Sequence, residues 1–239
     1  MHIKHLGIIK YGGLIVISFI FMFGNIFSES LDRLPVIGSI VNVFNTTFFF
    51  QYKDNEISGD IPNIKYQKEI DDVLNDDINR FTYAIIENFF KEYADDKYQY
   101  TKIDYAVITD NYLWFTLKID VLEIMASAYN YSKYYHINKK SDKIIILDDL
   151  FKDKEYKRVI NDEIKRQMRS RMKENENLVY WIDNADQTTD FKTIKDDQNF
   201  YFDKKGKLVI VFDQLEVGPG FMGIQEFLID SKIYEDYLK

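Results

Sequence analysis

Cysteine is absent from this 239-residue chain, and there are only three prolines and three histidines. Without cysteine the chain can hold no disulfide, no thiol nucleophile and no cysteine-ligated zinc. The histidines, His2, His5 and His136, lack metal-ligand spacing, and no Ser-His-Asp set can be assembled from the sequence. Gly218-Pro-Gly220 has neither the lysine nor the spacing of a P-loop. We therefore expect no catalytic residue, no metal and no cofactor, and predict that the protein is not an enzyme.

Positive charge is also scarce, since 31 Lys and Arg face 39 Asp and Glu, for a formal net charge of −8. A nucleic-acid-binding domain is normally basic, so we expect no nucleic acid among the partners. An acidic domain suits a basic protein partner through electrostatic complementarity. The alternative, equally good on charge alone, is that moderate acidity only keeps the protein soluble.

One long apolar run lies near the N-terminus, from Leu14 to Phe23, and it extends outward to Tyr11 and Phe27. Its length falls between that of a signal-peptide core and that of a spanning helix of about 20 residues. Basic residues precede the run and acidic residues follow it, which places the N-terminus inside. We predict a short cytoplasmic stub at 1–10 and a transmembrane signal anchor at 11–27. The protein would then be a single-pass cell-membrane protein with an extracytoplasmic C-terminal domain.

A juxtamembrane segment at 28–54 is expected to follow the anchor. Ser28-Glu29-Ser30 is a weak small-x-small match to a signal-peptidase site, with cleavage before Leu31, and an uncleaved anchor is the alternative. After Pro35 the spacing predicts a short amphipathic helix with one apolar side, formed by Val36, Ile37, Ile40, Val41 and Phe44. The polar shift at 51–60 is predicted to mark the start of the ectodomain.

The ectodomain shows both helical and strand periodicity. Apolar residues at helical spacing predict a helix over 66–93, with its core-facing stripe at Ile70, Val73, Leu74, Ile78, Phe81, Ile85 and Phe89. Clean alternation predicts a strand over 113–121, paired through a turn at Asp110-Asn111 with one around 105–108. Further strands are predicted at 129–137 and 144–147, so that three or four antiparallel strands follow one another.

The C-terminal part repeats the combination of helix and strands. A second helix is predicted over 153–173, with a basic second half that we interpret as a solvated face. A long loop at 183–198 precedes a hairpin of 200–202 with 208–212, a strand at 227–229 and a short closing helix capped by Ser231. The predicted fold class is α+β, with antiparallel sheet or sheets packed against two main helices and preceded by one N-terminal transmembrane helix. We expect two α+β subdomains, 55–147 and 148–239.

The most unusual local sequence is Glu216-Val-Gly-Pro-Gly-Phe-Met-Gly223, in a loop between two strands. Proline stiffens such a turn, and the glycines permit backbone conformations that other residues avoid. Phe221 and Met222 would project from a fixed frame, as binding anchors do. A hairpin corner whose Phe221 packs in the core is an equally good interpretation.

Several motifs in this order resemble those of the RsiV-type anti-sigma factors, over nearly the whole chain after Ser30. They are Leu34-Pro-Val-Ile-Gly38, Leu150-Phe-Lys-Asp153, Gln167-Met168 with Met172-Lys-Glu174, Tyr180-Trp181, Phe191-Lys-Thr193, Asp197-Gln198 and Leu215-Glu-Val-Gly-Pro-Gly-Phe-Met-Gly223. The C-terminal third is the most specific part. That third also resembles a domain of unknown function found in some secreted polysaccharide deacetylases.

The resemblance implies that the ectodomain binds lysozyme and fills its active-site cleft. Binding would expose a signal-peptidase site, where signal peptidase would cut the chain. A site-2 protease would then cut within the membrane. This second cleavage would free an extracytoplasmic-function (ECF) sigma factor that switches on lysozyme resistance. Cleavage is expected after Ser30, at the site formed by Ser28, Ser30 and Leu31. The lysozyme-binding loop would comprise Pro219, Gly220, Phe221 and Met222, where Phe221 replaces a family tyrosine. Residues 126–132 match a second contact region, which gives Ser127 and Tyr129 as further binding residues.

The sequence departs from the family at its N-terminus, where only about ten residues precede the apolar run. A segment that short cannot form a helical hairpin around a sigma factor. The departure favours an alternative function, a surface lysozyme inhibitor or decoy that binds no sigma factor. A peptidoglycan-binding accessory module is the third possibility.

Overall fold

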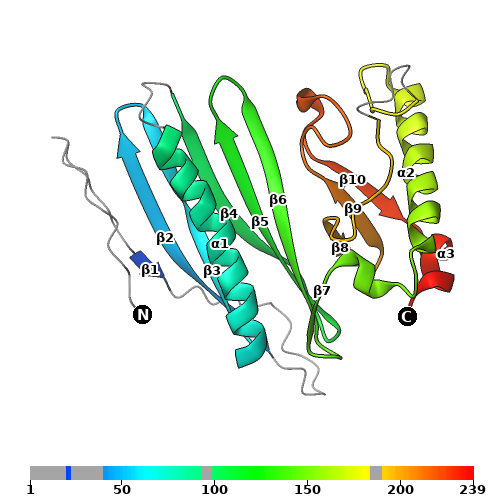
Figure 1. The fold of residues 1–239 in the computed structure, drawn as a ribbon, viewed down its shortest axis with the longest axis horizontal. Coiled ribbons are helices and arrows are strands. Elements are labelled where there is room, and N and C mark those ends of the chain that lie inside the picture. Colours follow the sequence, from blue (N-terminus) through cyan, green and yellow to red (C-terminus); the bar gives the residue numbers. More distant parts are fainter. Residues whose placement is uncertain (1–19, 23–39, 93–97, 184–189) are drawn as a thin grey trace.

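The computed structural model describes residues 20–22, 40–92, 98–183 and 190–239. They form two lobes side by side (Figure 1). The N-terminal lobe contains a seven-stranded sheet and one long helix, α1 (Lys68–Glu92). The C-terminal lobe contains a three-stranded sheet and a second long helix, α2 (Glu155–Glu174). The predicted α+β class and both main helices are confirmed.

The strands of the larger sheet lie in chain order. They are β1 (Ile20–Met22), β2 (Asn42–Tyr52), β3 (Asn55–Lys65), β4 (Tyr100–Asp110), β5 (Trp114–Ile124), β6 (Ala128–Asn138) and β7 (Lys143–Ile145). All neighbours are antiparallel except β3 and β4, which run parallel. The expectation of purely antiparallel sheets was therefore wrong for this pair. Helix α1 connects β3 to β4, and a helical crossover returns the chain to the end from which the first strand started.

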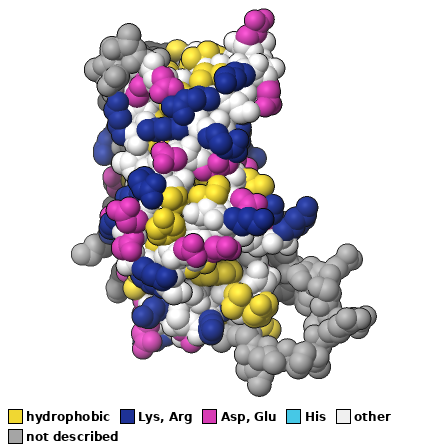
Figure 2. All heavy atoms as spheres, turned by 90° about the vertical axis from the view of Figure 1, so that its right-hand side faces the viewer, with side chains coloured by type: hydrophobic (Ala, Val, Ile, Leu, Met, Phe, Trp, Pro, Cys, Tyr) yellow, Lys and Arg dark blue, Asp and Glu magenta, His cyan; other side chains and the backbone are white. Residues whose placement is uncertain are grey.

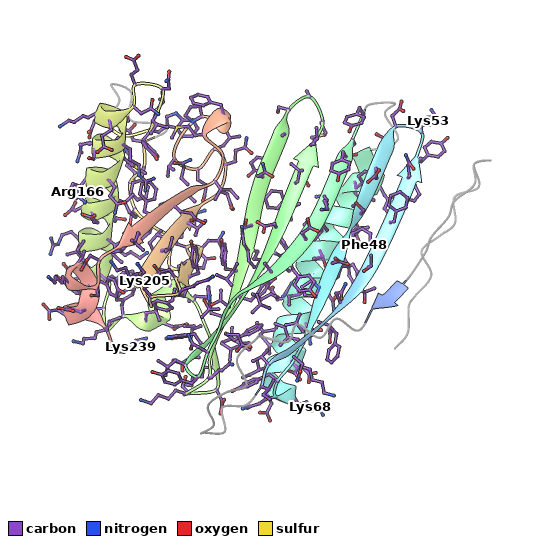
Figure 3. The ribbon with its side chains drawn as sticks, turned by 180° about the vertical axis from the view of Figure 1, so that it is seen from behind. Phe48, Lys53, Lys68, Arg166, Lys205 and Lys239 are labelled. Atoms are coloured by element: carbon purple, nitrogen blue, oxygen red, sulfur yellow. The ribbon has the colours of Figure 1, made fainter. Side chains whose placement is uncertain are left out.

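One face of this sheet is covered by α1. Ile70, Leu74 and Ile78 of the helix are buried in one cluster with Leu117 and Ile119 of β5. Figure 3 shows that Lys53, in the β2–β3 turn, and Lys68, at the start of α1, lie at opposite ends of β3. The helix therefore runs back along the sheet. Val73, which the helical stripe had assigned to the core, is exposed instead.

The C-terminal lobe is built from shorter elements. Strands β8 (Phe200–Phe202), β9 (Leu208–Phe212) and β10 (Gln225–Ile229) form an antiparallel sheet in the order β10-β9-β8. Short helices η2 (Leu147–Leu150), η3 (Gly220–Met222), α3 (Ser231–Tyr234) and η4 (Glu235–Tyr237) complete it. Helix α2 buries Tyr156, Ile160, Ile164 and Met168 completely against this sheet.

The two sheets also pack against each other. Alternation along β6 turns Tyr135 and Ile137 toward the α1 side and Tyr134 and His136 toward the C-terminal lobe. The Tyr134 ring stacks on Tyr201 of β8, with ring centroids 6.0 Å apart. The His136 ring stacks on Phe200 at 4.0 Å. The layers are therefore helix, sheet, sheet and helix.

The predicted juxtamembrane helix after Pro35 was wrong where the structure describes it. Asn42–Tyr52 is strand β2, paired with β3 residue for residue. Its threonines and consecutive phenylalanines favour a strand, and β3 supplies the partner. The polar shift at 51–60, the predicted start of the ectodomain, lies across the tight turn of the β2–β3 hairpin and the first half of β3. The first lobe therefore includes β2.

The predicted anchor and cleavage site fall mostly outside the described residues. Of 11–27, only Ile20–Met22 is described, and it forms β1, an edge strand against Asn45–Thr47 of β2 and not part of a helix. Ser28, Ser30 and Leu31 lie outside the described residues. Within the described ranges no helix is long and apolar enough to cross a membrane. The anchor and its cleavage remain predictions.

The closing helix is present, but its cap differs from the one predicted. The side chain of Asp230 accepts a hydrogen bond from the backbone N–H of Lys232, and Ser231 is the first helical residue. Aspartate and serine are both good cap residues, so the local sequence could not decide between them.

Candidate functional site

Two segments from different lobes meet at one end of the molecule. They are the β5–β6 turn with the first residues of β6, and the loop 213–224 between β9 and β10 (Figure 1). The buried side chain of Gln214 joins them. Its Nε2 donates to the carbonyl oxygens of Ala128, at 3.1 Å, and Gly220, at 2.7 Å, while its Oε1 accepts from the Asn130 N–H at 2.7 Å. The two contact regions implied by the resemblance are therefore neighbours.

The backbone of the loop is constrained at several points. Leu215 and Gly223 have positive φ angles of 71° and 63°, a region that glycine adopts easily and leucine does not. A Cβ on Gly218 would lie 2.7 Å from the Val179 carbonyl oxygen, so a side chain there would clash with the backbone. Pro219 begins the single turn η3, in which the Met222 N–H donates to the Pro219 carbonyl at 3.0 Å. The loop therefore holds a defined shape.

Phe221 and Met222 take opposite roles in this loop. Phe221 is 72% exposed, so the interpretation of this residue as a core side chain was wrong. Met222 packs against the core of the C-terminal lobe, and its Sδ accepts from the Val179 N–H at 3.3 Å. Met222 thus fixes the loop, and Phe221 projects from it. The prediction that both side chains project was therefore wrong for Met222.

Further apolar side chains are exposed on the two segments that Gln214 joins. They are Met125 in the β5–β6 turn, Tyr129 at the start of β6 and Leu215 in the loop. The Tyr129 ring lies beside that of Tyr131, with centroids 5.2 Å apart. Ser127 is exposed at the turn itself. We call Met125, Ser127, Tyr129, Leu215 and Phe221 the apolar rim.

Two acidic residues, Asp213 and Glu216, flank Gln214 and Leu215 in the same loop. Asp213 Oδ1 accepts from the Ser132 N–H at 2.8 Å, and burial raises the pKa of this carboxyl to about 6, with Glu216 adding to the rise. Glu216 Oε2 accepts from the Asp213 N–H at 2.8 Å, and its Oε1 pairs with Lys195 Nζ at 2.5 Å. Burial, followed by the charges of Asp213 and Glu216, also raises the pKa of Tyr129. The site therefore carries negative charge beside aromatic surface.

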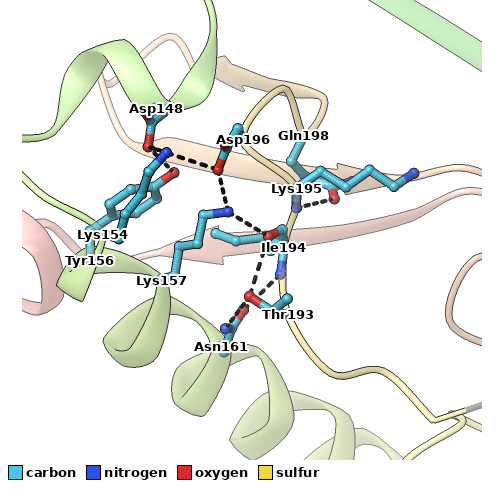
Figure 4. A network of polar contacts seen from close by, with 10 residues as sticks. All are labelled: Asp148, Lys154, Tyr156, Lys157, Asn161, Thr193, Ile194, Lys195, Asp196 and Gln198. Atoms are coloured by element: carbon cyan, nitrogen blue, oxygen red, sulfur yellow. Dashed lines mark hydrogen bonds and ion pairs between the residues drawn. The ribbon is translucent and has the colours of Figure 1, made fainter.

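Lys195 is held in place by a polar network between α2 and the segment 193–198 (Figure 4). The Asn161 side chain accepts from the Ile194 N–H at 3.0 Å and donates to Thr193 Oγ1 at 2.9 Å. Gln198 Oε1 accepts from the Lys195 N–H at 3.3 Å. These contacts tie the acidic side of the site to the second helix.

The same segment is also held at the start of α2. Asp196 pairs with Lys157 at 2.5 Å and with Lys154 at 3.0 Å, and Lys154 also reaches Asp148 at 2.7 Å. Lys154 and Asp196 are more than half exposed, so the pairs order the segment more than they stabilise the fold.

The basic second half of α2 forms no comparable site. Figure 2 shows basic and acidic side chains interspersed on this face of the molecule. Arg166 pairs with Glu163 at 2.7 Å, and Arg169 pairs with Asp183 at 2.8 Å. Arg171 donates to the Glu226 carbonyl at 2.8 Å and so covers the free edge of β10. The sequence predicts only a solvated face here. The structure adds that Arg166, Arg169 and Arg171 also have partners within the fold.

The described part of the chain shows no group of three or more His, Asp or Glu side chains that could hold a metal. His136, the one histidine within it, is completely buried, and burial lowers its pKa to about 3. Its Nδ1 lies 3.1 Å from Thr116 Oγ1. His136 is thus a neutral residue of the packing between the lobes.

Sequence reasoning placed Pro219, Gly220, Phe221, Met222, Ser127 and Tyr129 at a binding surface, and the structure brings them together at one end of the molecule. It did not single out Gln214, Asp213 or Lys195, which organise that surface. Gln214 contacts Ala128, 86 positions away, and no local pattern signals such a contact.

Three comparisons place the chain among known proteins. Residues 148–232 match the family described as "Protein of unknown function (DUF3298)". Over 216 residues the chain is 33% identical to the anti-sigma-V factor RsiV of Bacillus subtilis, covering 88% of this chain and 75% of that protein.

Two crystal structures of DUF3298 family proteins share the fold. The Bacteroides fragilis protein matches with a TM-score of 0.62 at 13% identity, over 84% of this chain and 95% of that one. The Pseudomonas aeruginosa protein matches with a TM-score of 0.58 at 10% identity, over 84% and 94%. At such low identity these two show the fold alone.

Proposed function

The chain belongs to the RsiV family of anti-sigma factors, and from this premise we propose that it is a lysozyme-binding sensor that controls an ECF sigma factor. In this proposal the described domain is extracytoplasmic and tethered by the segment 11–27. Lysozyme binding leads to cleavage after Ser30 by signal peptidase, and then to cleavage by a site-2 protease. The protein acts as a regulator and not as an enzyme.

The observation that carries lysozyme binding is the exposure of Phe221 on a fixed loop beside Tyr129. A large aromatic side chain left in solvent by a rigid backbone loses little conformational entropy when it enters a partner's cleft. Pro219 and Gly220 place Phe221 on a narrow turn, and Met222 holds that turn by packing against the core of the C-terminal lobe. This geometry suits insertion into a concave surface such as an enzyme's active-site cleft.

Charge supports the same partner. The chain has a formal net charge of −8, and Asp213 and Glu216 lie in the same loop as Leu215 and Phe221. Animal lysozymes are strongly basic, so the two surfaces attract at long range and association is accelerated. Binding should therefore weaken as salt is added.

The test is the affinity of the full chain, in mild detergent, for hen lysozyme, measured by calorimetry or surface plasmon resonance. We expect binding at micromolar concentration or tighter. Phe221→Ala should weaken it by at least about 30-fold, the loss of about 2 kcal/mol that defines an interface hot spot. The full chain is needed because a fragment starting at residue 51 would remove most of β2.

Tyr112→Ala is the matched control. Tyr112 is also a highly exposed aromatic residue, but it lies in the β4–β5 turn, at the end of β5 opposite the apolar rim. It should leave the affinity unchanged, and both variants should melt like the wild type. A wild-type chain that fails to bind lysozyme at micromolar concentration contradicts the proposal. Co-sedimentation with purified cell wall in the absence of lysozyme would instead favour the peptidoglycan-binding alternative.

A further inference from the structure

The first residues of β6 form an edge that no described strand completes. Residues 128–138 pair with β5 on one side, but on the other side β7 pairs only with His136–Asn138. The N–H and C=O groups of residues 128, 130 and 132 that point away from β5 need other partners, because an unpaired buried backbone group is costly.

Three residues of the C-terminal lobe supply these partners. Asn199 Nδ2 donates to the Ser132 carbonyl at 2.8 Å, and Asp213 Oδ1 accepts from the Ser132 N–H at 2.8 Å. Gln214 serves Asn130 with both backbone and side chain, because its N–H donates to the Asn130 carbonyl at 3.3 Å and its Oε1 accepts from the Asn130 N–H. We call these contacts the β6 seam.

Gln214 differs from the other seam residues because its amide also reaches the binding loop. One Nε2 hydrogen goes to the Ala128 carbonyl and the other to the Gly220 carbonyl. A Cβ on Gly220 would lie 3.1 Å from this nitrogen, so the amide lies directly against the η3 turn. Both donors and the oxygen of the amide are used, and only one orientation of the amide satisfies all three partners.

We propose that Gln214 is the positioning residue of the binding surface, which fixes the Phe221 turn relative to Tyr129. Tyr129 lies between Ala128 and Asn130, and Phe221 follows Gly220, so one buried amide holds the backbone on both sides of Tyr129 and immediately before Phe221. The inference rests on the proposed function, since it concerns how two expected contacts reach a partner in one fixed arrangement. A partner that binds both side chains then spends no free energy on aligning them.

The test compares Gln214→Ala with Asn199→Ala in the full chain, using hen lysozyme as the probe. Asn199→Ala also removes one side-chain hydrogen bond from the β6 seam but leaves Gly220 and Ala128 bonded. We expect Gln214→Ala to weaken binding about tenfold, mainly through faster dissociation. The control should stay within about twofold. Gln214→Glu should bind at least as poorly as the alanine variant, because its carboxylate would face two carbonyl oxygens.

Hydrogen exchange supplies a readout that does not require a partner. The Met222 and Gly223 amides bond within the η3 turn, and the Asn130 amide bonds to Gln214. In Gln214→Ala these three amides should exchange faster together, while amides in the centres of β5 and α2 stay protected. In Asn199→Ala the η3 amides should be unchanged.

Equal binding by Gln214→Ala and the wild type, or an equal loss in both variants, overturns the inference. If the wild type fails to bind lysozyme, the proposed function is wrong and the exchange experiment alone decides the positioning role. Faster exchange at both Asn130 and η3 then supports that role, and unchanged exchange at η3 overturns it.

Discussion

The two lobes differ in how they satisfy their backbone polar groups. In the N-terminal lobe, five strands of 11 residues, β2 to β6, form long backbone ladders in the antiparallel pairs β2–β3, β4–β5 and β5–β6. Side-chain amides bond to the backbone there at strand ends and turns. For example, the Asn75 side chain accepts a hydrogen bond from the Ile64 N–H and donates one to the Ile64 carbonyl. In the C-terminal lobe the strands have three to five residues, and the irregular segments rely on amide side chains.

Those amides act at the places where the chain leaves regular structure. Gln198 donates to the Val211 carbonyl, Gln225 donates to the Met222 carbonyl, and Asn161 holds Ile194. A strand ladder is held by backbone groups, whereas a loop held by an amide side chain depends on that side chain. The difference explains why the exposed Phe221 loop belongs to the second lobe, where side chains specify a rigid irregular surface.

The largest expected effect on stability comes from shortening one buried isoleucine in each lobe, which would leave a cavity in its core. Ile119 in β5 and Ile164 in α2 are both completely buried, so Ile119→Ala and Ile164→Ala should each cost about 3 kcal/mol of stability. Because the sheets pack through Tyr134 and His136, we expect one cooperative unfolding transition in both variants. Urea denaturation followed by far-UV circular dichroism and by tryptophan fluorescence can test this. Circular dichroism reports both lobes, whereas Trp181 lies in the second lobe and Trp114, although part of β5, packs on the core of that lobe beside Phe202.

Fluorescence therefore reports the second lobe more than the first. Coincident midpoints by the two methods support one cooperative unit. If Ile164→Ala lowered the fluorescence midpoint and left a second, unshifted transition in the circular dichroism, the lobes would unfold as two separate domains.

A smaller loss of stability is expected on acidification, through His136 at the junction of the lobes. Burial holds the pKa of His136 at about 3, below its unfolded value of 6.5, so the unfolded state binds the proton more tightly. This contribution to stability is complete above pH 6.5 and is lost as the pH falls from there toward 3. At pH 5 the loss relative to pH 7.5 should be about 2 kcal/mol.

The measurement is urea denaturation at both pH values for the wild type and His136→Phe, which cannot titrate at this position. The variant should lose less stability on acidification than the wild type. The same loss in both proteins would mean that His136 is not responsible.

The smallest effect on stability is expected from replacing Asp213, a buried carboxyl group in the second lobe. Its pKa is shifted in the direction opposite to that of His136. Burial raises the pKa of Asp213 above its unfolded value of 3.8 to about 6, so its favourable contribution is complete below pH 3.8 and is lost as the pH rises through 6. Asp213→Asn keeps an acceptor for the Ser132 N–H and removes the buried charge. It should stabilise the protein by about 1 kcal/mol at pH 7.5 and by nothing near pH 3.5.

Thermal or urea unfolding of Asp213→Asn across this range checks the sign. Destabilisation at pH 7.5 would show that the ionised carboxylate, and not just its acceptor oxygen, holds Ser132 in the β6 seam. His136 and Asp213 would then both favour neutral pH, and the two lobes would no longer respond to acid in opposite directions.

Much of the fold follows from periodicity. The helices at 68–92 and 155–174, the β4–β5–β6 meander and the β8–β9 hairpin agree with the predicted ranges, because each has a strong apolar repeat and clear turn residues. Strand β2 was misassigned, since its apolar residues also fit a helix and its partner β3 has weak alternation. The parallel pairing of β3 with β4 depends on where α1 returns the chain, which no local repeat encodes.

For the candidate site, the Gly-Pro-Gly loop drew attention through its sequence, and the sequence left open whether Phe221 is buried. The answer depends on Met222, which occupies the adjacent core position and leaves Phe221 in solvent. The roles of Gln214 and Asp213 depend on β6, about 80 residues earlier in the chain, so they could not be inferred locally.

Composition and neighbouring residues account for the absence of thiol chemistry, the acidic charge, the two amphipathic helices and the stiff loop that carries Phe221. The exposure of Phe221, and the link through Gln214 between its loop and the segment that carries Tyr129, arise from the packing of the two lobes. An unfinished sheet edge must find hydrogen-bond partners wherever the fold brings them, and here they come from Asn199 and from the loop of the candidate site.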